Sequence, residues 1–250
     1  MNKDDTCIII PSRIGSTRLK NKPLVDINGK TLIQRVVINA LDITENVYVA
    51  TDSSLIQDNL KKITNNVVMT SSEHISGTDR VCEAANKLNL SDETFILNLQ
   101  GDEPFIPNDL VKNVIDDYFK KSCDVITVSS EISSELDINN PNSVLLEVDK
   151  NNYATSFIRT GDIQNPRRHI GVYGYNLKTL NELVNLDPTD SEVKLKLEQL
   201  RFLENDYSIY VSFYDGFIPH GIDTVDDLKS ASEYLFNKWI FYPIKLLVIA

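Results

Sequence analysis

The sequence predicts an α/β fold, built on a mixed, mostly parallel sheet with helices on both faces. In the first half of the chain, short β-branched runs alternate with amphipathic segments of helix length, which is the pattern of βαβ units. The chain has 250 residues, of which 42% are hydrophobic and 24% charged, so it has the composition of a folded protein with a sizeable core. Repeats, low-complexity tracts and Gly/Ser linkers are missing from the sequence, which favours one domain over residues 1–250.

The individual elements follow from apolar runs and their turn signals. The first half predicts strands at 7–10, 47–51, 67–70, 95–100 and 125–129, with helices at 31–41, 54–62, 79–88 and 107–120 between them. Pro107 suits the first turn of the last of these helices. This βαβαβ alternation predicts a mostly parallel sheet with helices on both faces.

The rhythm changes after residue 130. Strands are predicted at 144–148, 153–158 and 170–175 with little helix between them, and turn signals lie at 139–142 and 149–152. We therefore expect a smaller mixed β lobe inserted over approximately 131–176. Helices are predicted again at 179–186, 191–203 and 225–236, with a strand near 207–213. The apolar end, 239–250, contains Pro243 and Lys245 and is shorter than the roughly 20 residues of a spanning helix, so we expect an edge strand, a core plug or a subunit contact.

Charge and cysteine content exclude several classes of protein. Lys and Arg number 25 against 36 Asp and Glu, a net charge of -11, which argues against a general nucleic-acid binder and an anionic membrane surface as partner. The three cysteines Cys7, Cys82 and Cys123 form no CxxC pair, which excludes a disulfide scaffold and a four-cysteine zinc site. The polar start does not resemble a signal peptide, so we expect a cytoplasmic protein.

The positive charge is concentrated near the N-terminus. Between residues 13 and 35 one acidic residue, Asp26, opposes six basic ones, which leaves this segment at +5 and the remainder at -16; the basic residues are Arg13, Arg18, Lys20, Lys22, Lys30 and Arg35. A local cationic segment on an acidic protein suits a small polyanion, although on charge alone a solvated basic loop explains it equally well.

The loop after the first strand supplies a candidate phosphate site. Its small residues between Pro11 and Leu19 leave backbone N–H groups open, and Arg13, Arg18 and Lys22 add charge. The segment lacks GxGxxG, and the P-loop-like Gly29-Lys30-Thr31 has Leu24 where a P-loop needs glycine, so we reject both nucleotide motifs.

Three further segments lie where strands end or helices begin. Asp102 follows the strand at 95–100, and Asp223 precedes the helix at 225–236; together they suit Mg²⁺ beside phosphates, the alternatives being a turn and a helix cap. The backbone and hydroxyls around Ser76 and Gly77, at the entry to a helix, could hold a base or a sugar, and Arg80 could bind an acid; a plain helix cap is the alternative.

Taken together, these segments resemble the 3-deoxy-manno-octulosonate (Kdo) cytidylyltransferases. The matching motifs occur in order along most of the chain; they are IIIPSR (8–13), STRL (16–19), KPL (22–24), ATD (50–52), SGTDR (76–80), LQGDEP (99–104), NPN (140–142), HIGVY (169–173), LEQLR (197–201) and GIDT (221–224). The resemblance implies a nucleotide-diphospho-sugar transferase (Rossmann-like) fold, a Mg²⁺-dependent reaction of CTP with a sugar acid, a homodimer and a place in lipopolysaccharide biosynthesis.

The resemblance also implies roles for individual residues. Lys22, Arg13, Asp102 and Asp223 would be catalytic, the two aspartates as the metal ligands. The nucleotide would be bound by Pro11, Ser12, Arg13, Arg18, Lys22, Ser76, Gly77 and Arg80. The sugar acid would be bound by Arg80, Gln100, His169, Tyr173, Glu198 and Gln199. For His169, a structural role in its strand is the alternative.

Departures from the family pattern fall in the sugar-binding half. The loop after Arg159 is shortened, Leu145 stands near the family's usual lysine, and Leu195 replaces a usual glutamate. The sequence thus predicts CTP chemistry, with Kdo, 8-amino-8-deoxy-Kdo or a nonulosonate as the acid; a catalytically silent nucleotide-binding paralogue is the alternative from another class.

Overall fold

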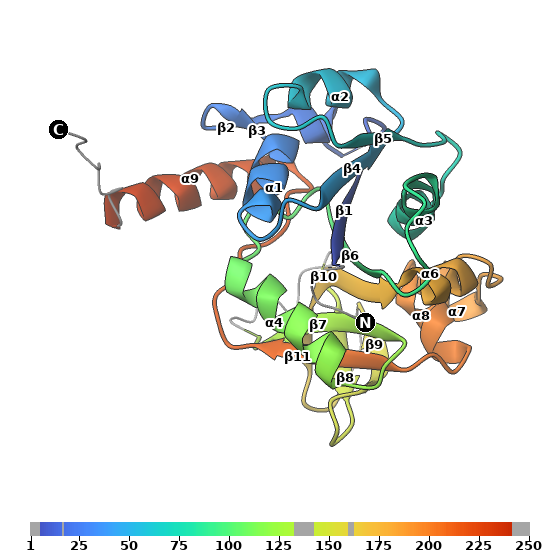
Figure 1. Ribbon diagram of the computed structural model, residues 1–250. Coiled ribbons are helices and arrows are strands. Elements are labelled where there is room, and N and C mark those ends of the chain that lie inside the picture. Colours follow the sequence, from blue (N-terminus) through green and yellow to red (C-terminus); the bar gives the residue numbers. More distant parts are fainter. Residues whose placement is uncertain (1–5, 17, 133–142, 160–162, 242–250) are drawn as a thin grey trace.

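The computed structural model describes residues 6–16, 18–132, 143–159 and 163–241, with the side chains of the last helix described as far as Phe236 (Figure 1). The NPN segment at 140–142, part of the shortened loop after Arg159, and residues 242–250 of the apolar end lie outside the described residues.

One nine-stranded sheet forms the centre of the described chain. Its main path runs β11-β7-β10-β6-β1-β4-β5, and β8 and β9 form a hairpin that joins β10. The strands are β1 (Cys7–Ser12), β4 (Val47–Thr51), β5 (Val67–Met69), β6 (Phe95–Leu99), β7 (Val125–Ser130), β8 (Leu145–Val148), β9 (Ala154–Ile158), β10 (Arg167–Asn176) and β11 (Ile209–Tyr214), with β2 (Asp26–Ile27) and β3 (Lys30–Thr31) as a separate pair.

The sheet contains two groups of parallel strands that are separated by one antiparallel strand. The strands β6, β1, β4 and β5 are mutually parallel, as are β7 and β11, whereas β10 runs antiparallel between β6 and β7. The predicted mixed, mostly parallel sheet is confirmed. The strands expected in the 131–176 insertion all pair into this same sheet, β10 as an interior strand and the β8–β9 hairpin at its start.

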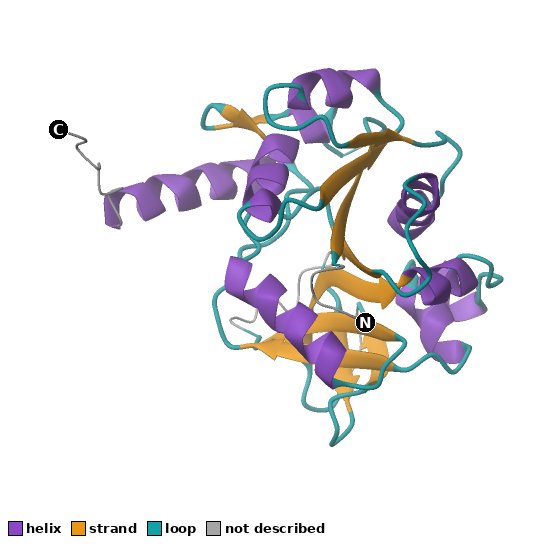
Figure 2. Cartoon of the chain, viewed as in Figure 1, coloured by secondary structure: helices purple, strands orange, loops and turns teal. Residues whose placement is uncertain are grey.

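Helices cover both faces of the sheet (Figure 2). They are α1 (Leu32–Leu41), α2 (Ser54–Leu60), α3 (Gly77–Lys87), α4 (Asn108–Lys120), α6 (Leu177–Leu183), α7 (Asp190–Leu195), α8 (Gln199–Glu204) and α9 (Val225–Phe241), with a 3₁₀ turn, η2, at Lys22–Leu24. Helix α9 extends away from the body of the molecule (Figure 1).

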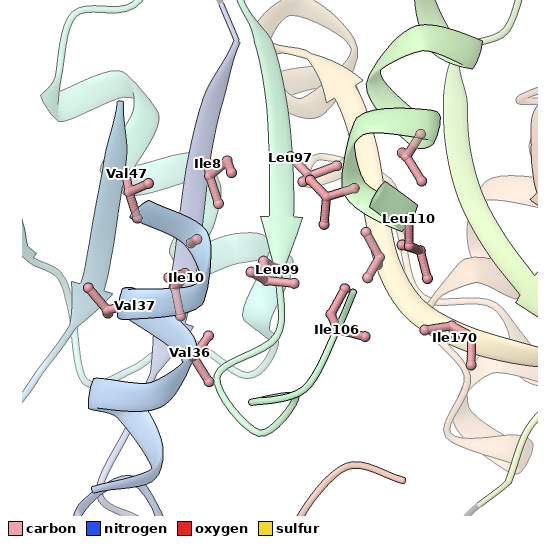
Figure 3. Close-up of a cluster of buried hydrophobic side chains, with 14 of the residues drawn as sticks. Ile8, Ile10, Val36, Val37, Val47, Leu97, Leu99, Ile106, Leu110 and Ile170 are labelled. Carbon is pink, nitrogen blue, oxygen red and sulfur yellow. The ribbon is translucent and has the colours of Figure 1, made fainter. Parts of the chain in front are cut away.

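Successive side chains of β1 point alternately into two hydrophobic cores, one on each face of the sheet. Ile8 and Ile10 pack with Val36 and other apolar residues of α1 and α4 on one face (Figure 3). Cys7 and Ile9 belong to the opposite core, with α3 and α6. Successive side chains of a strand point to opposite faces, so a strand covered on both sides is apolar throughout.

Several predicted boundaries were wrong. The single helix expected at 191–203 is broken into α7 and α8, because Lys196 adopts a left-handed backbone with φ 54°. Pro107 is the N-cap of α4 and not part of its first turn. The last helix was predicted to end at 236, but α9 continues to Phe241 and so includes the first residues of the apolar end.

Candidate active site

Two cavities adjoin at the carboxyl ends of β1 and β6. The first, of about 360 Å³, is lined by residues of the predicted nucleotide set: Pro11, Ser12, Arg13, Arg18, Lys22, Ser76, Gly77 and Arg80. The second, of about 310 Å³, is lined by Gln100, His169, Tyr173 and Gln199 of the predicted sugar set. Gln100, Asp102 and Asp223 line both cavities. The structure therefore places two ligand-sized spaces on either side of the predicted metal carboxylates.

The backbones of β1 and of the segment after β6 approach each other closely beside the cavities. Gly101 follows β6, and a Cβ atom placed there would lie 2.7 Å from the carbonyl oxygen of Pro11 in β1. Cβ atoms do not approach a backbone oxygen so closely, so glycine is needed where the chain leaves β6 toward Asp102.

Lys22 joins the two aspartates. Its Nζ donates to Asp102 Oδ2 at 2.6 Å and to Asp223 Oδ1 at 2.9 Å. Arg18 Nη2 lies 3.1 Å from the same Asp223 oxygen. Burial acts to lower the pKa of Lys22, but the charges and hydrogen bonds of Asp102 and Asp223 outweigh it and the pKa is raised. The lysine thus stays an ammonium between two carboxylates.

The remaining side chains of the loop after β1 present polar groups to the first cavity. Arg13 is exposed at its wall, as expected for a residue that meets a polyanion. Ser12 is buried, and its Oγ has no hydrogen-bond partner among the described residues. Ser12 is also one of the residues that line the first cavity, which makes it a candidate ligand contact.

The loop before α3 is held by a carboxylate clamp. Ser76 begins α3 with a capping box that includes Asp79. Glu83 Oε2 accepts from the backbone N–H of Ser71 at 2.8 Å and pairs with His74 Nε2, and Lys87 Nζ lies 2.7 Å from Glu83 Oε1. Burial opposes ionisation of Glu83, but these partners, Lys87 first, lower its pKa to about 2.

Arg80 lines the first cavity but directs its guanidinium into the protein. Nη2 lies 3.0 Å from Asp52 Oδ2, Nη1 donates to Thr70 Oγ1 at 2.6 Å, and the side chain is 3% exposed. Arg80 was predicted to contact both substrates; the structure places its guanidinium against Asp52 and Thr70, which follow β4 and β5, and Arg80 lines the first cavity but is not among the residues that line the second.

His169 and Tyr173 lie side by side on β10. Their ring centroids are 5.5 Å apart, and His169 Nε2 lies 2.9 Å from Thr127 Oγ1. Burial, with the charge of Arg159, lowers the pKa of His169 to about 3, and burial also raises the pKa of Tyr173. Both rings are therefore uncharged, and His169 is suited to hydrogen bonding and not to holding a positive charge.

The remaining predicted sugar-binding residues, Gln100, Glu198 and Gln199, differ in what they contact. Gln199 is buried and lines the second cavity, and Gln100 donates to Asn98 Oδ1 at 3.0 Å. Glu198 Oε2 accepts from Thr78 Oγ1 at 2.6 Å, which ties α8 to the start of α3. Burial raises the pKa of Glu198, although the Thr78 and Ser76 hydroxyls partly oppose this.

Several lining residues were missed by the sequence-based prediction. The second cavity also contains Glu103, Arg159, Arg168 and Lys196. Burial first, and then the charge of Asp102, raise the pKa of Glu103 to about 8. The sequence shows Glu103 in the motif LQGDEP and Arg168 at the start of β10, and either could have been noted as a candidate. Their proximity could not be predicted, because it depends on the antiparallel placement of β10 beside β6.

The residues present fit a divalent cation bound jointly with a nucleotide. Among the described residues there is no group of three or more His, Cys, Asp or Glu side chains poised for a metal. Mg²⁺ commonly uses one or two carboxylates and completes its shell with phosphate oxygens and water. Asp102 and Asp223, whose oxygens meet at one lysine Nζ beside the first cavity, match that requirement.

Comparison with known proteins supports the family resemblance that the sequence motifs predicted. A family model described as cytidylyltransferase matches residues 7–209. The 3-deoxy-manno-octulosonate cytidylyltransferase of Francisella tularensis subsp. novicida is 39% identical over 245 residues, covering 92% of this chain and 98% of that protein. The chain belongs to this family. The enzyme of the same name from Thermodesulfovibrio yellowstonii is also 39% identical, over 252 residues.

Solved structures extend the agreement to the fold of this cytidylyltransferase. A structure of CMP:2-keto-3-deoxy-manno-octonic acid synthetase complexed with CTP superposes with a TM-score of 0.85 at 30% identity, covering 93% of this chain and 99% of that one. HddC from Yersinia pseudotuberculosis, at 18% identity and a TM-score of 0.67, shares the fold. The nucleotidyltransferase fold and the family resemblance predicted from the motifs are confirmed. No helix in the described part of the cytidylyltransferase has the length and apolar character needed to cross a membrane.

Proposed function

We propose that this cytidylyltransferase couples CTP to a 3-deoxy-2-keto sugar acid, Kdo or a close analogue, and releases pyrophosphate. The observation that carries the proposal is the meeting of two cavities at one Lys22–Asp102–Asp223 cluster. The wall with Arg13, Arg18 and Lys22 suits a triphosphate, and the second cavity suits a polyhydroxylated acid. The curated relatives carry the name of the Kdo enzyme.

The proposed reaction is a displacement at phosphorus. The anomeric hydroxyl of the sugar acid attacks the α-phosphorus of CTP, an O–P bond forms, the bond to the β-phosphate bridging oxygen breaks, and the hydroxyl proton is released. Charge accumulates on the phosphoryl oxygens and on pyrophosphate, so catalysis comes chiefly from positioning and cationic groups. Arg13, Arg18 and Lys22 supply the fixed positive charge, and Asp223 and Asp102 orient Lys22 between the cavities.

Mg²⁺ is the proposed cofactor. Asp102 and Asp223 would hold it, and it would supply charge neutralisation at the phosphates. Because Lys22 already bridges both carboxylates, a bound cation must share them with the lysine or move it.

A cytoplasmic homodimer is the proposed physiological form. Exposed apolar side chains on and before α9, namely Phe217, Val225 and Phe236, support a subunit contact on this side of the molecule. The three cysteines are free thiols, which suits a reducing compartment. Sedimentation velocity of the full chain tests the dimer.

The proposed function is tested by pyrophosphate release from CTP and Mg²⁺ with Kdo, 8-amino-8-deoxy-Kdo and N-acetylneuraminate. We expect rapid release with Kdo, and loss of Mg²⁺-dependent release in Asp102→Asn and Asp223→Asn while both variants keep the native fold. The exposed Asp226, paired with Lys229 on α9, offers Asp226→Asn as a matched control. Release with none of the acids by the unaltered protein would favour a silent paralogue.

A further inference from the structure

The turn between α7 and α8 has an unusual backbone beside the second cavity. Lys196 ends α7 with φ 54° and ψ 49°, a left-handed conformation that costs a non-glycine residue on the order of 1 kcal/mol. Lys196 is one of the residues that line the second cavity, and it is exposed to solvent. A charged residue with a left-handed backbone in the wall of a ligand-sized cavity is a candidate for a functional role.

The surrounding residues hold this turn in place. Arg159 Nε donates to the carbonyl of Leu195 at 3.2 Å, and its Nη2 donates to the carbonyl of Lys196 at 3.4 Å. Arg201 of α8 reaches back to Glu192 of α7 at 3.0 Å. Leu197, directly after the turn, is 3% exposed. The position of Lys196 is therefore fixed by its neighbours on both sides.

The ammonium of Lys196 is available to a ligand. Among the described residues, its Nζ has no hydrogen-bond or ion-pair partner, and the side chain is solvent-accessible at the cavity wall. By contrast, Arg168 of the same cavity donates to the carbonyl of Ile218 at 2.9 Å, and Lys22 is engaged by two carboxylates. A lysine ammonium acts as a compact point charge whose influence extends about 10 Å at 0.1 M salt.

We propose that Lys196 is a specificity-determining residue that selects the charge of the sugar acid. Its ammonium attracts the anionic acid and disfavours an acid that carries an amino group. This inference rests on the proposed function. The side chain is exposed to solvent, so its interaction with the acid is as weak as that of a surface ion pair. It should change the ratio of kcat/KM for the two acids roughly two- to fivefold.

The test compares kcat/KM for Kdo and for 8-amino-8-deoxy-Kdo at saturating CTP in one buffer, so that nucleotide and metal effects cancel in the ratio. We expect Lys196→Gln to lower the preference for Kdo roughly two- to fivefold through KM, with kcat for Kdo unchanged. Lys196→Arg should retain the preference, and Lys196→Glu should lower it further. In 1 M NaCl, where screening shortens to about 3 Å, the unaltered protein and Lys196→Gln should converge.

Two additional variants separate charge from folding. Lys194→Gln removes an exposed lysine from the last turn of α7 and should keep the preference of the unaltered protein. Lys196→Asn is a second neutral variant, and asparagine suits the left-handed backbone. An unchanged preference in folded Lys196→Gln and Lys196→Asn, with active unaltered protein, overturns the role of Lys196 alone. Lack of turnover by the unaltered protein with every acid overturns the proposed function and this role together.

Discussion

Lys22 Nζ lies 2.6 Å from Asp102 Oδ2 and 2.9 Å from Asp223 Oδ1, so one ammonium connects the end of β6 with the segment before α9. The lysine neutralises two carboxylates that would otherwise repel each other, and it stands where both cavities meet. The same three residues therefore link stability to the proposed chemistry.

Replacing this lysine should expose both roles. Lys22→Met is expected to lower kcat roughly 100-fold or more, the size of effect seen when one charge-stabilising group is removed. It should also lower the Tm without metal, and Mg²⁺ should raise the Tm of Lys22→Met more than that of the unaltered protein, because the carboxylates have lost their ammonium. Lys20→Met, an exposed neighbour, is the control. A Mg²⁺ response equal to that of the unaltered protein would separate Lys22 from the metal site.

The clamp at Glu83 should affect nucleotide binding. Glu83→Gln loses the charge that holds Ser71 and His74, and with them the loop that carries Ile75 and Ser76 to the first cavity. A loss of about 0.5–1.5 kcal/mol corresponds to a KM for CTP raised roughly two- to tenfold, with kcat little changed. Glu73→Gln alters an exposed glutamate of the same loop and should match the unaltered protein. Equal KM values for CTP in all three proteins would show that the clamp does not position the loop.

Gly101 should be intolerant of substitution. In Gly101→Ala the new Cβ would meet the backbone carbonyl of Pro11 at 2.7 Å, so either β1 or the segment carrying Asp102 must shift. We expect a Tm lowered by several degrees and a reduced kcat/KM. Gly15→Ala meets no atom within 4 Å and should leave the Tm unchanged. Thermal unfolding of both variants is the measurement, and equal Tm values would contradict the close approach.

The partly buried His169 should make stability depend on pH. The folded-state pKa of His169, about 3, is below the ordinary value of 6.5. Between these two values the imidazole of His169 is protonated in the unfolded chain but neutral in the folded protein. The free energy of unfolding is therefore not reduced by this group above pH 6.5, and it decreases as pH falls toward 3. At pH 5 the loss is up to about 2 kcal/mol. Urea unfolding at pH 7 and pH 5 should show a smaller decrease for His169→Gln than for the unaltered protein or for His220→Gln, an exposed histidine. Identical decreases in all three would show that His169 is protonated in the folded state.

The sequence by itself determined the succession of strands and helices in the first half of the chain, the loop after β1 and the candidate aspartates. Ile8–Ile10 and the strand at Phe95–Leu99 are apolar runs followed directly by polar residues, and in a parallel sheet those ends share one edge. The family motifs added the division between nucleotide and sugar residues, because they occur as contiguous segments in order.

Tertiary structure decided what each side chain contacts. The sequence placed Arg80 with both substrates, but packing of α3 against β4 turns its guanidinium to Asp52. Periodicity predicted one helix through Lys196, because local propensity does not record the hydrogen bonds from Arg159 that hold the break. The joining of Asp102 and Asp223 by Lys22 likewise depends on contacts between residues far apart in sequence, and only the folded chain brings their charges together.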